Sequence, residues 1–479
     1  MHATIEAGAA GRTATGATPT RDRAIDAARA GCLAVVFLLH AMMVGVSVGP
    51  GGPVLENALE GWDFLAPATW VVQIMPLFFL IGGFSGWTAW QRRRARGIGP
   101  ASFVRDRITR LVRPAVPLVA VVGLALAALA AAGVPAEIVQ TASFRIGQPL
   151  WFLAVYLGAS ALVPLMVRLH EWRPGVTIGA LVAAVVAVDA LRFATGVEAL
   201  GFLNLAFVWL AMQQLGFLLA DGTVDRMPVA ARLRLAACAL GGLLAITLSG
   251  PYTPDLLQNL NPPTICLVLL GTAQLALFSL VRRPLGRWAE RRGPARAVAS
   301  FGEWGMTMYL WHLPAFVLLA AGLLAANASF GLALPEPLSA EWWASRPLWL
   351  VGAAAVTALA VRAFARWERV PRRPAPGSGN DRPAGAGPAG SERMPLLTAL
   401  ADALPRVPAW LAVPAGVLGV GTALVVGFAP APALVSLALL GVALLGARAP
   451  RMHGRAALAA RVDAGMSVVG GKLIPQHQM

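Results

Sequence analysis

Apolar runs of about twenty residues follow one another along most of the chain, separated by short polar or arginine-rich breaks. Runs of this length are long enough to cross a bilayer as helices, and they lack the alternation that marks the strands of a membrane barrel. The pattern therefore predicts an all-α, polytopic transmembrane helical bundle. The ten core spans are expected near 27–48, 67–90, 110–133, 149–169, 176–195, 199–220, 232–250, 263–281, 298–328 and 347–366.

Two further apolar segments, near 407–428 and 431–447, predict a helical hairpin after the core. This hairpin holds no ionisable residue between Arg406 and Arg448, so it suits a helix–helix or subunit contact better than chemistry. A stretch rich in Pro, Gly and Arg precedes it and is typical of a flexible tether. The predicted organisation is a disordered cytoplasmic tail at 1–26, a ten-helix core at 27–369, a linker at 370–395, a transmembrane hairpin at 396–450 and a cytoplasmic tail at 451–479.

Composition and charge agree with a membrane protein. The chain is 57% apolar, and its 13% of charged residues is about half of what a soluble protein carries. A net charge of +16 would suggest nucleic acid in a soluble protein, but here the basic residues cluster in alternate loops. With a cytoplasmic N-terminus, only Arg145, Arg192 and Arg346 of the 39 Lys and Arg residues fall near the other face. We therefore expect both termini in the cytoplasm, a multi-pass position in a bacterial plasma membrane, and no nucleic-acid partner.

The three cysteines, Cys32, Cys238 and Cys266, lie in or near apolar spans. Their spacing fits neither a disulfide framework nor a metal site, so no metal is expected.

Arg29 and His40 are the most informative pair of residues. They lie eleven residues apart, which is three helical turns plus about 20°, so they share one face of the first span. The rise between them is roughly 16 Å. Ionisable groups at membrane depth are costly and mark functional sites by default.

Two further residues belong with this pair. His312 lies as deep in its own span as His40 does, so the two imidazoles can meet around a common cavity. The alternative is that each histidine makes a polar packing contact between helices. Asp26 precedes Arg29 by three residues and either orients its guanidinium or forms an ion pair of little energetic value at the helix entry.

Arg107, Arg110 and Arg113 recur at three-residue spacing where a helix enters the membrane from the cytoplasmic side. Planar guanidinium groups along one flank suit a phosphorylated ligand, with contact to lipid phosphates as the alternative. The stretch Pro76-Leu77-Phe78-Phe79-Leu80-Ile81-Gly82-Gly83-Phe84 predicts either a broken helix that lines a cavity or a tight helix–helix contact.

Five motifs occur in one order: Arg29-x10-His40, Pro76-Leu77-Phe78-Phe79, Arg107-x2-Arg110-x2-Arg113-Pro114, Leu150-Trp151-Phe152 and Tyr309-Leu310-Trp311-His312. With these motifs the chain resembles, over residues 21–370, the membrane-bound acyltransferase 3 family. That family includes bacterial O-acetyltransferases of polysaccharide, peptidoglycan and lipid-linked sugars, and the glucan succinyltransferases. The resemblance implies a ten-helix core with both ends cytoplasmic.

The resemblance also implies an acyl-CoA-dependent O-acyltransferase. Such an enzyme would move an acyl group, expected to be acetyl, from cytoplasmic acyl-CoA to a hydroxyl of an extracytoplasmic envelope glycan or glycolipid. The expected catalytic set is His40 as the catalytic histidine, Arg29 as its partner, Asp26, His312 and Tyr309. The expected acyl-CoA set is Arg107, Arg110, Arg113 and Trp151.

The chain departs from the family's usual pattern at two places. Gly305 and Met306 replace the Ser and Tyr that begin the pattern Ser-Tyr-x-x-Tyr-Leu-x-His, and Gly82-Gly83-Phe84 replaces Ser-Gly-Phe. These departures concern substrate preference more than reaction class.

The chemistry fits this assignment. A pantetheine arm can span the roughly 16–20 Å between arginines at the inner mouth and a base at mid-membrane. A neutral imidazole can take the proton of a hydroxyl that attacks the thioester, and an acyl-histidine intermediate stays open. The alternatives are a transporter or flippase of a small polar or lipid-linked substrate, and a scaffold without activity. The bilayer is a further partner, and the question of a homo-oligomer stays open.

Overall fold

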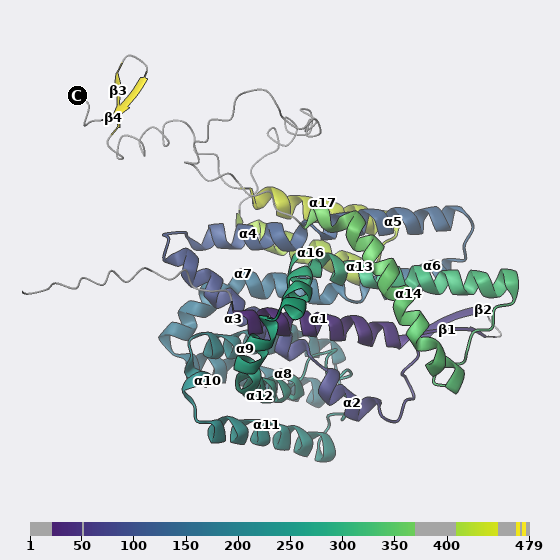
Figure 1. Cartoon of the computed structure of the whole chain (residues 1–479), viewed down its shortest axis with the longest axis horizontal. Helices are drawn as coiled ribbons and strands as arrows, with labels where there is room; N and C mark the ends of the chain where they lie inside the picture. Colours follow the sequence, from purple (N-terminus) through teal and green to yellow (C-terminus); the bar gives the residue numbers. More distant parts are fainter. Residues whose placement is uncertain (1–21, 50–51, 369–408, 449–465, 470–471, 476–479) are drawn as a thin grey trace, which may run out of the picture.

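The computed structural model describes residues 22–49, 52–368, 409–448, 466–469 and 472–475 (Figure 1). The predicted linker at 370–395 and nearly all of the predicted tail at 1–26 lie outside the described residues. Within the described part, ten helical segments are long and apolar enough to cross a membrane, which confirms the predicted all-α bundle.

The ten spans follow the predicted order. They are α1 (Arg23–Met43), α2 with α3 (Leu65–Val72 and Met75–Arg94), α4 with α5 (Pro100–Val112 and Ala115–Ala131), α6 with α7 (Ala136–Gly147 and Leu150–Trp172), α8 (Pro174–Thr195), η1 with α9 (Glu198–Leu203 and Asn204–Ala220), α11 (Val229–Ser249), α12 (Ile265–Ala289), α13 (Arg292–Phe330), and α14 with η2 (Ala340–Phe364 and Ala365–Trp367). The short α10 (Thr223–Arg226) follows α9. Helix α1 runs through the middle of the bundle and contacts α3, α12 and α13 (Figure 1).

The first span differs from its expected bounds of 27–48. Helix α1 begins at Arg23 because the Asp22 carboxylate caps it, accepting the backbone N–H groups of Ala24 and Ile25 at 3.0 and 3.1 Å. It ends at Met43, where β1 (Val44–Gly49) starts and pairs antiparallel with β2 (Gly52–Asn57). Valines that alternate with Gly and Ser favour a strand over a helix here. A second short strand pair, β3 (Met466–Val469) and β4 (Lys472–Pro475), lies near the C-terminus.

The helix break in the second span lies at Gln73 and Ile74, just before Pro76, which occupies the first turn of α3. The Gln73 side chain donates to the Leu256 carbonyl oxygen at 3.0 Å, and the Gln274 side chain donates to the Gln73 carbonyl oxygen at 2.9 Å. These bonds compensate the interrupted helix. The interruption therefore precedes the Pro76–Phe84 stretch, and the stretch itself is unbroken helix within α3. Its glycines instead make the tight helix–helix contact that was the alternative, because a Cβ at Gly83 would clash with the Gln213 backbone of α9.

The loop between α11 and α12 is held by a buried carboxylate. Asp189 of α8 accepts from the Asn204 side chain at 2.9 Å, the Tyr252 hydroxyl at 3.0 Å and the Ile265 backbone N–H at 2.9 Å. Burial and the neighbouring Asp189 carboxylate raise the pKa of Tyr252. The phenol therefore stays protonated and keeps donating to Asp189.

The predicted C-terminal hairpin is formed by α16 (Ala409–Val425) and α17 (Pro430–Gly446), which pack against each other and against α4, α5 and α7 (Figure 1). Gly416 allows close approach, since a Cβ there would lie 2.8 Å from the Leu157 side chain and 3.3 Å from that of Val112. The Phe428 backbone N–H donates to the Ser143 hydroxyl at 3.0 Å. The hairpin thus shares one apolar core with the ten-helix bundle.

Candidate functional site

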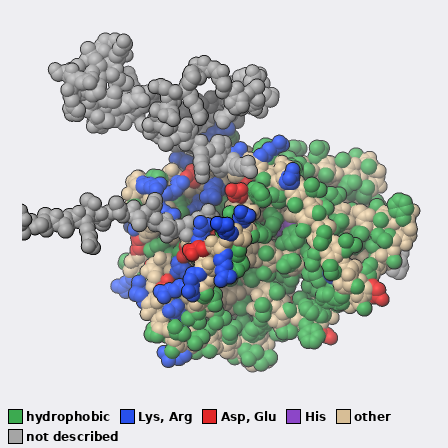
Figure 2. All heavy atoms as spheres, viewed as in Figure 1, with side chains coloured by type: hydrophobic (Ala, Val, Ile, Leu, Met, Phe, Trp, Pro, Cys, Tyr) green, Lys and Arg blue, Asp and Glu red, His purple; other side chains and the backbone are tan. Residues whose placement is uncertain are grey.

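A cavity of about 590 Å³ lies at the end of the bundle where arginine side chains gather (Figure 2, left). Its walls come from α1, α3, α4, α7 and α13, with Glu368 beyond η2. One end is lined by four arginines, Arg29, Arg92, Arg107 and Arg110, together with four carboxylates, Asp22, Asp26, Glu303 and Glu368. The remaining lining is mainly apolar and aromatic, so the cavity runs from a charged, arginine-rich mouth to an apolar inner end.

Helix α1 supplies one continuous stripe of this wall. Asp22, Asp26, Arg29, Leu33 and Val36 all line the cavity, at spacings of three or four residues that place them on one helix face. The same spacing continues to His40, four residues after Val36. The face that the sequence predicts for Arg29 therefore faces the cavity. Neither His40 nor His312 is among the cavity-lining residues of the described chain.

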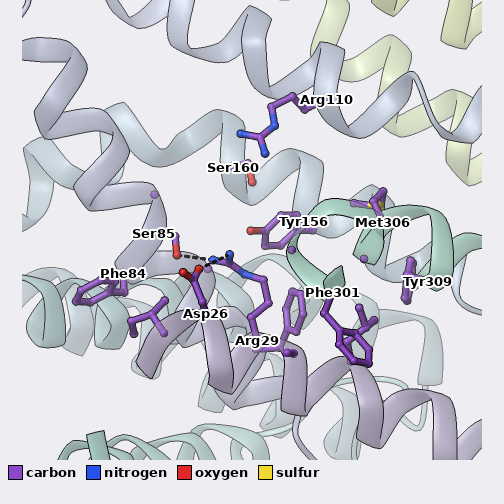
Figure 3. A pocket seen from close by; sticks show the side chains of 18 of the residues that line it. Asp26, Arg29, Phe84, Ser85, Arg110, Tyr156, Ser160, Phe301, Met306 and Tyr309 are labelled. Atoms are coloured by element: carbon purple, nitrogen blue, oxygen red, sulfur yellow. Dashed lines mark hydrogen bonds and ion pairs between the residues drawn. The ribbon is translucent and has the colours of Figure 1, made fainter. Parts of the chain in front are cut away.

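Arg29 is held inside the cavity by two partners (Figure 3). Its Nη2 donates to the Ser85 hydroxyl at 2.6 Å, and its Nη1 lies 3.7 Å from the Asp26 Oδ1. Asp26 is 9% exposed, so this ion pair is shielded from solvent on the carboxylate side. The ion pair between Asp26 and Arg29, which the sequence suggested, is therefore present. Together with the bond to Ser85 it orients the guanidinium toward α3.

Two of the three arginines at three-residue spacing, Arg107, Arg110 and Arg113, reach the cavity. The Arg107 guanidinium lies 4.9 Å from the centre of the Phe103 ring, and Arg110 extends toward Ser160 and Tyr156 (Figure 3). Arg113 is not among the cavity-lining residues. Three-residue spacing turns each successive side chain back by about 60°, so the third member leaves the shared face. Helix α4 also ends at Val112, immediately before Arg113.

The two deep histidines contact each other. The His40 Nδ1 lies 2.7 Å from the His312 Nε2, the ring centroids are 5.0 Å apart, and the planes differ by 5°. The centroid distance equals about the N–N distance plus two ring radii, so the rings lie edge to edge in one plane. The His312 Nδ1 lies 2.6 Å from the Tyr309 carbonyl oxygen, and His312 is 1% exposed.

These contacts fix the tautomers of the neutral pair. A carbonyl oxygen only accepts, so the His312 Nδ1 carries the hydrogen and its Nε2 is left as an acceptor. The His40 Nδ1 must then donate to that Nε2. The His40 Nε2 is consequently left with its lone pair, which is the form that a general base requires.

A family profile described as "Acyltransferase domain" matches residues 22–365. The chain belongs to the acyltransferase 3 family. No curated protein and no solved structure matches the chain. The match includes both histidines and every arginine of the cavity, whereas Glu368 and the C-terminal hairpin lie beyond it. The chain is therefore a membrane-embedded acyltransferase domain with an added helix pair.

Two residues expected in the site of this acyltransferase have other contacts. The Tyr309 hydroxyl donates to the Pro149 carbonyl oxygen, so its ring, not its hydroxyl, contributes to the cavity wall. Trp151 stacks on Trp209, with centroids 5.7 Å apart, and is not among the cavity-lining residues. Its neighbour Phe152 lines the cavity instead, because adjacent residues point about 100° apart on a helix.

Sequence reasoning missed several polar residues of the cavity, among them Ser85, Tyr156 and Glu368. Glu368 accepts from the Thr307 hydroxyl at 2.6 Å and from the backbone N–H groups of Thr307 and Met306 at 2.9 and 3.3 Å. It therefore holds α13 one turn before Tyr309. Tyr156 could have been found, because it is one of only three tyrosines and lies inside an apolar span. Within the described residues, no cluster of three or more His, Cys, Asp or Glu side chains is placed to hold a metal ion.

Proposed function

We propose that this protein is an integral-membrane O-acyltransferase that takes an acyl group, expected to be acetyl, from acyl-CoA. The acceptor is a hydroxyl of an envelope glycan or glycolipid on the opposite side of a bacterial plasma membrane. The arginine-rich end faces the cytoplasm under the positive-inside rule, with both termini on that side.

The observation that carries this proposal is the line from the arginine-rich mouth of the cavity to the histidine pair along a single face of α1. Arg29, Arg107 and Arg110 offer guanidinium groups in one cavity, which suits the phosphates of a nucleotide thioester. Val36 lies further along the same stripe, and His40 follows one turn later. A donor bound by its phosphates at the mouth would thus extend its thioester toward the His40 Nε2.

The chemistry then follows from the tautomers of the pair. The acceptor oxygen attacks the thioester carbonyl carbon while the His40 Nε2 takes the hydroxyl proton. The C–S bond breaks, and the CoA sulfur receives that proton from the His40 imidazolium. The His312 Nε2 continues to accept the hydrogen bond from the His40 Nδ1–H, and this bond stabilises the imidazolium that forms.

Two measurements test the proposal. Purified protein should cleave acetyl-CoA slowly without an acceptor, and mass spectrometry of envelope glycans and glycolipids should show an acyl group that a deletion strain lacks. A transporter or flippase would instead move its substrate across a proteoliposome membrane without thioester cleavage. Identical glycans in both strains, together with intact acetyl-CoA, would refute the acyltransferase activity.

A further inference from the structure

We infer that Phe78, together with Val36 and Met75, narrows the apolar inner end of the cavity and restricts the donor to short acyl chains. This inference rests on the proposed function, because it assigns the acyl-chain selectivity of the same site. It gives a role to the Pro76–Phe84 stretch, which the proposed chemistry does not otherwise use.

This narrow inner end lies about one helical turn short of the histidines. Val36 precedes His40 by four residues on α1, and Tyr309 precedes His312 by three residues on α13. One turn is about 5.4 Å of helix. A thioester that reaches the His40 Nε2 therefore passes Phe78, and its acyl chain has little length left inside the cavity.

Phe78 is fixed where it stands. Its ring centroid lies 5.0 Å from that of Phe152 at 85°, and 5.9 Å from that of Tyr156. It belongs to the first turn of α3, directly after the break that Gln73 secures through bonds to Leu256 and Gln274. The Phe78 side chain is thus held in place by its aromatic neighbours and by the fixed start of α3. A longer acyl chain cannot displace it easily.

Aromatic side chains also pack beside the histidine pair. Phe37 packs edge-on against Phe316 with centroids 5.1 Å apart, and Phe316 is fully buried. The Trp349 indole N–H donates to the Ala41 carbonyl oxygen at 2.8 Å, which locks α14 onto the end of α1. An acyl chain at the pair therefore lies between this aromatic packing and Phe78, so acetyl and similarly short chains fit best.

The test compares acetyl-, butyryl- and octanoyl-CoA as donors for purified full-length protein. The wild type should favour acetyl over octanoyl in kcat/KM. Phe78→Ala and the milder Phe78→Leu should raise the octanoyl-to-acetyl ratio, by about tenfold or more for Ala. Phe79→Leu is the matched control. Phe79 shares Phe152 and Tyr156 as neighbours with Phe78, but it stacks on Trp209 with centroids 4.3 Å apart and is not among the cavity-lining residues.

Each outcome decides the inference. A wild type that prefers octanoyl-CoA, or an unchanged ratio in a Phe78 variant that still cleaves acetyl-CoA, overturns the inference alone. An equal rise in Phe79→Leu also overturns it, since the effect would then be general loosening. A wild type that cleaves none of the three donors overturns the proposed function and this inference with it.

Discussion

His40 and His312 lie edge to edge in one plane, with the His40 Nδ1 2.7 Å from the His312 Nε2. His312 is therefore expected to fix the tautomer of His40. We predict that His312→Ala lowers kcat by roughly 10²-fold or more, because the base loses its orienting acceptor, while the KM for acyl-CoA stays close to that of the wild type. His312→Gln should recover part of the rate, since an amide oxygen can accept the same hydrogen.

The control for this prediction is His170→Gln. His170 is a second buried histidine, but its ring contacts Gln214 at 2.6 Å and Asp221 at 3.1 Å, outside the cavity. Its replacement should leave kcat within a few-fold of the wild type. Equal losses in both histidine variants would indicate a general structural defect and contradict the role assigned to His312.

Arg107, Arg110 and Arg113 should differ in their effect on donor binding. Arg107→Ala and Arg110→Ala each remove a guanidinium from the cavity, so the KM for acyl-CoA should rise by about 10- to 100-fold, in line with the loss of a hydrogen bond to a charged group. Lysine should rescue only in part, because it lacks the planar fork. Arg113→Ala serves as the comparison and should leave KM nearly unchanged. Steady-state kinetics with a fixed acceptor measure these KM values. An unchanged KM in both Arg107→Ala and Arg110→Ala would contradict a donor site and support lipid contact as their role.

Gly82 explains one departure from the family's usual Ser-Gly-Phe. A Cβ at Gly82 would lie 2.9 Å from the Tyr156 ring, so glycine lets that ring lie against α3 at the cavity wall. Gly82→Ala and Gly82→Ser should displace the ring and lower kcat/KM for acyl-CoA. Gly158→Ala is the control on α7, because a Cβ there has nothing within 4 Å. Wild-type kinetics in Gly82→Ser would show that Tyr156 adapts and that its position does not matter.

The hairpin α16–α17 matters more than its composition suggests. Without ionisable groups it is expected to be dispensable for transfer, yet it packs on α4, which carries Arg107 and Arg110. We predict that truncation near residue 385 lowers the thermal unfolding temperature and weakens donor binding. Gly416→Leu in the full chain should reproduce part of this loss, since it separates α16 from Val112 and Leu157. Normal stability and KM in the truncated protein would restore the view that the hairpin serves only as a subunit contact.

Long apolar runs made the bundle predictable. A helix in the membrane must form its backbone hydrogen bonds internally and must cross the hydrocarbon core, so the length of an apolar run indicates a span. The shared face of Arg29 and Asp26 followed from helical periodicity for the same reason. Contact between His40 and His312 was suggested by their equal depth, but the edge-to-edge geometry depends on how α1 and α13 pack, which a single sequence does not encode locally.

Other features depended on tertiary context. The apolar pattern predicted that the first helix continues to residue 48. The chain leaves the helix at Met43 instead, because the residues that follow pair with β2 as a strand. Trp151 and Arg113 belong to the right motifs but point away from the cavity, since rotation along a helix separates neighbours that a motif groups together. Glu368 joins the site through its contacts with Met306 and Thr307, 62 and 61 positions earlier in the chain.

The most direct test of the central claim is the rate of acyl transfer by purified His40→Ala protein, measured at saturating acyl-CoA against the wild type at equal folded amount. The account predicts a loss of roughly 10²- to 10⁴-fold in kcat with donor binding retained, because the base is removed while the arginine cavity stays intact. A near-normal kcat in His40→Ala would contradict the assignment of His40 as the base and, with it, the proposed mechanism.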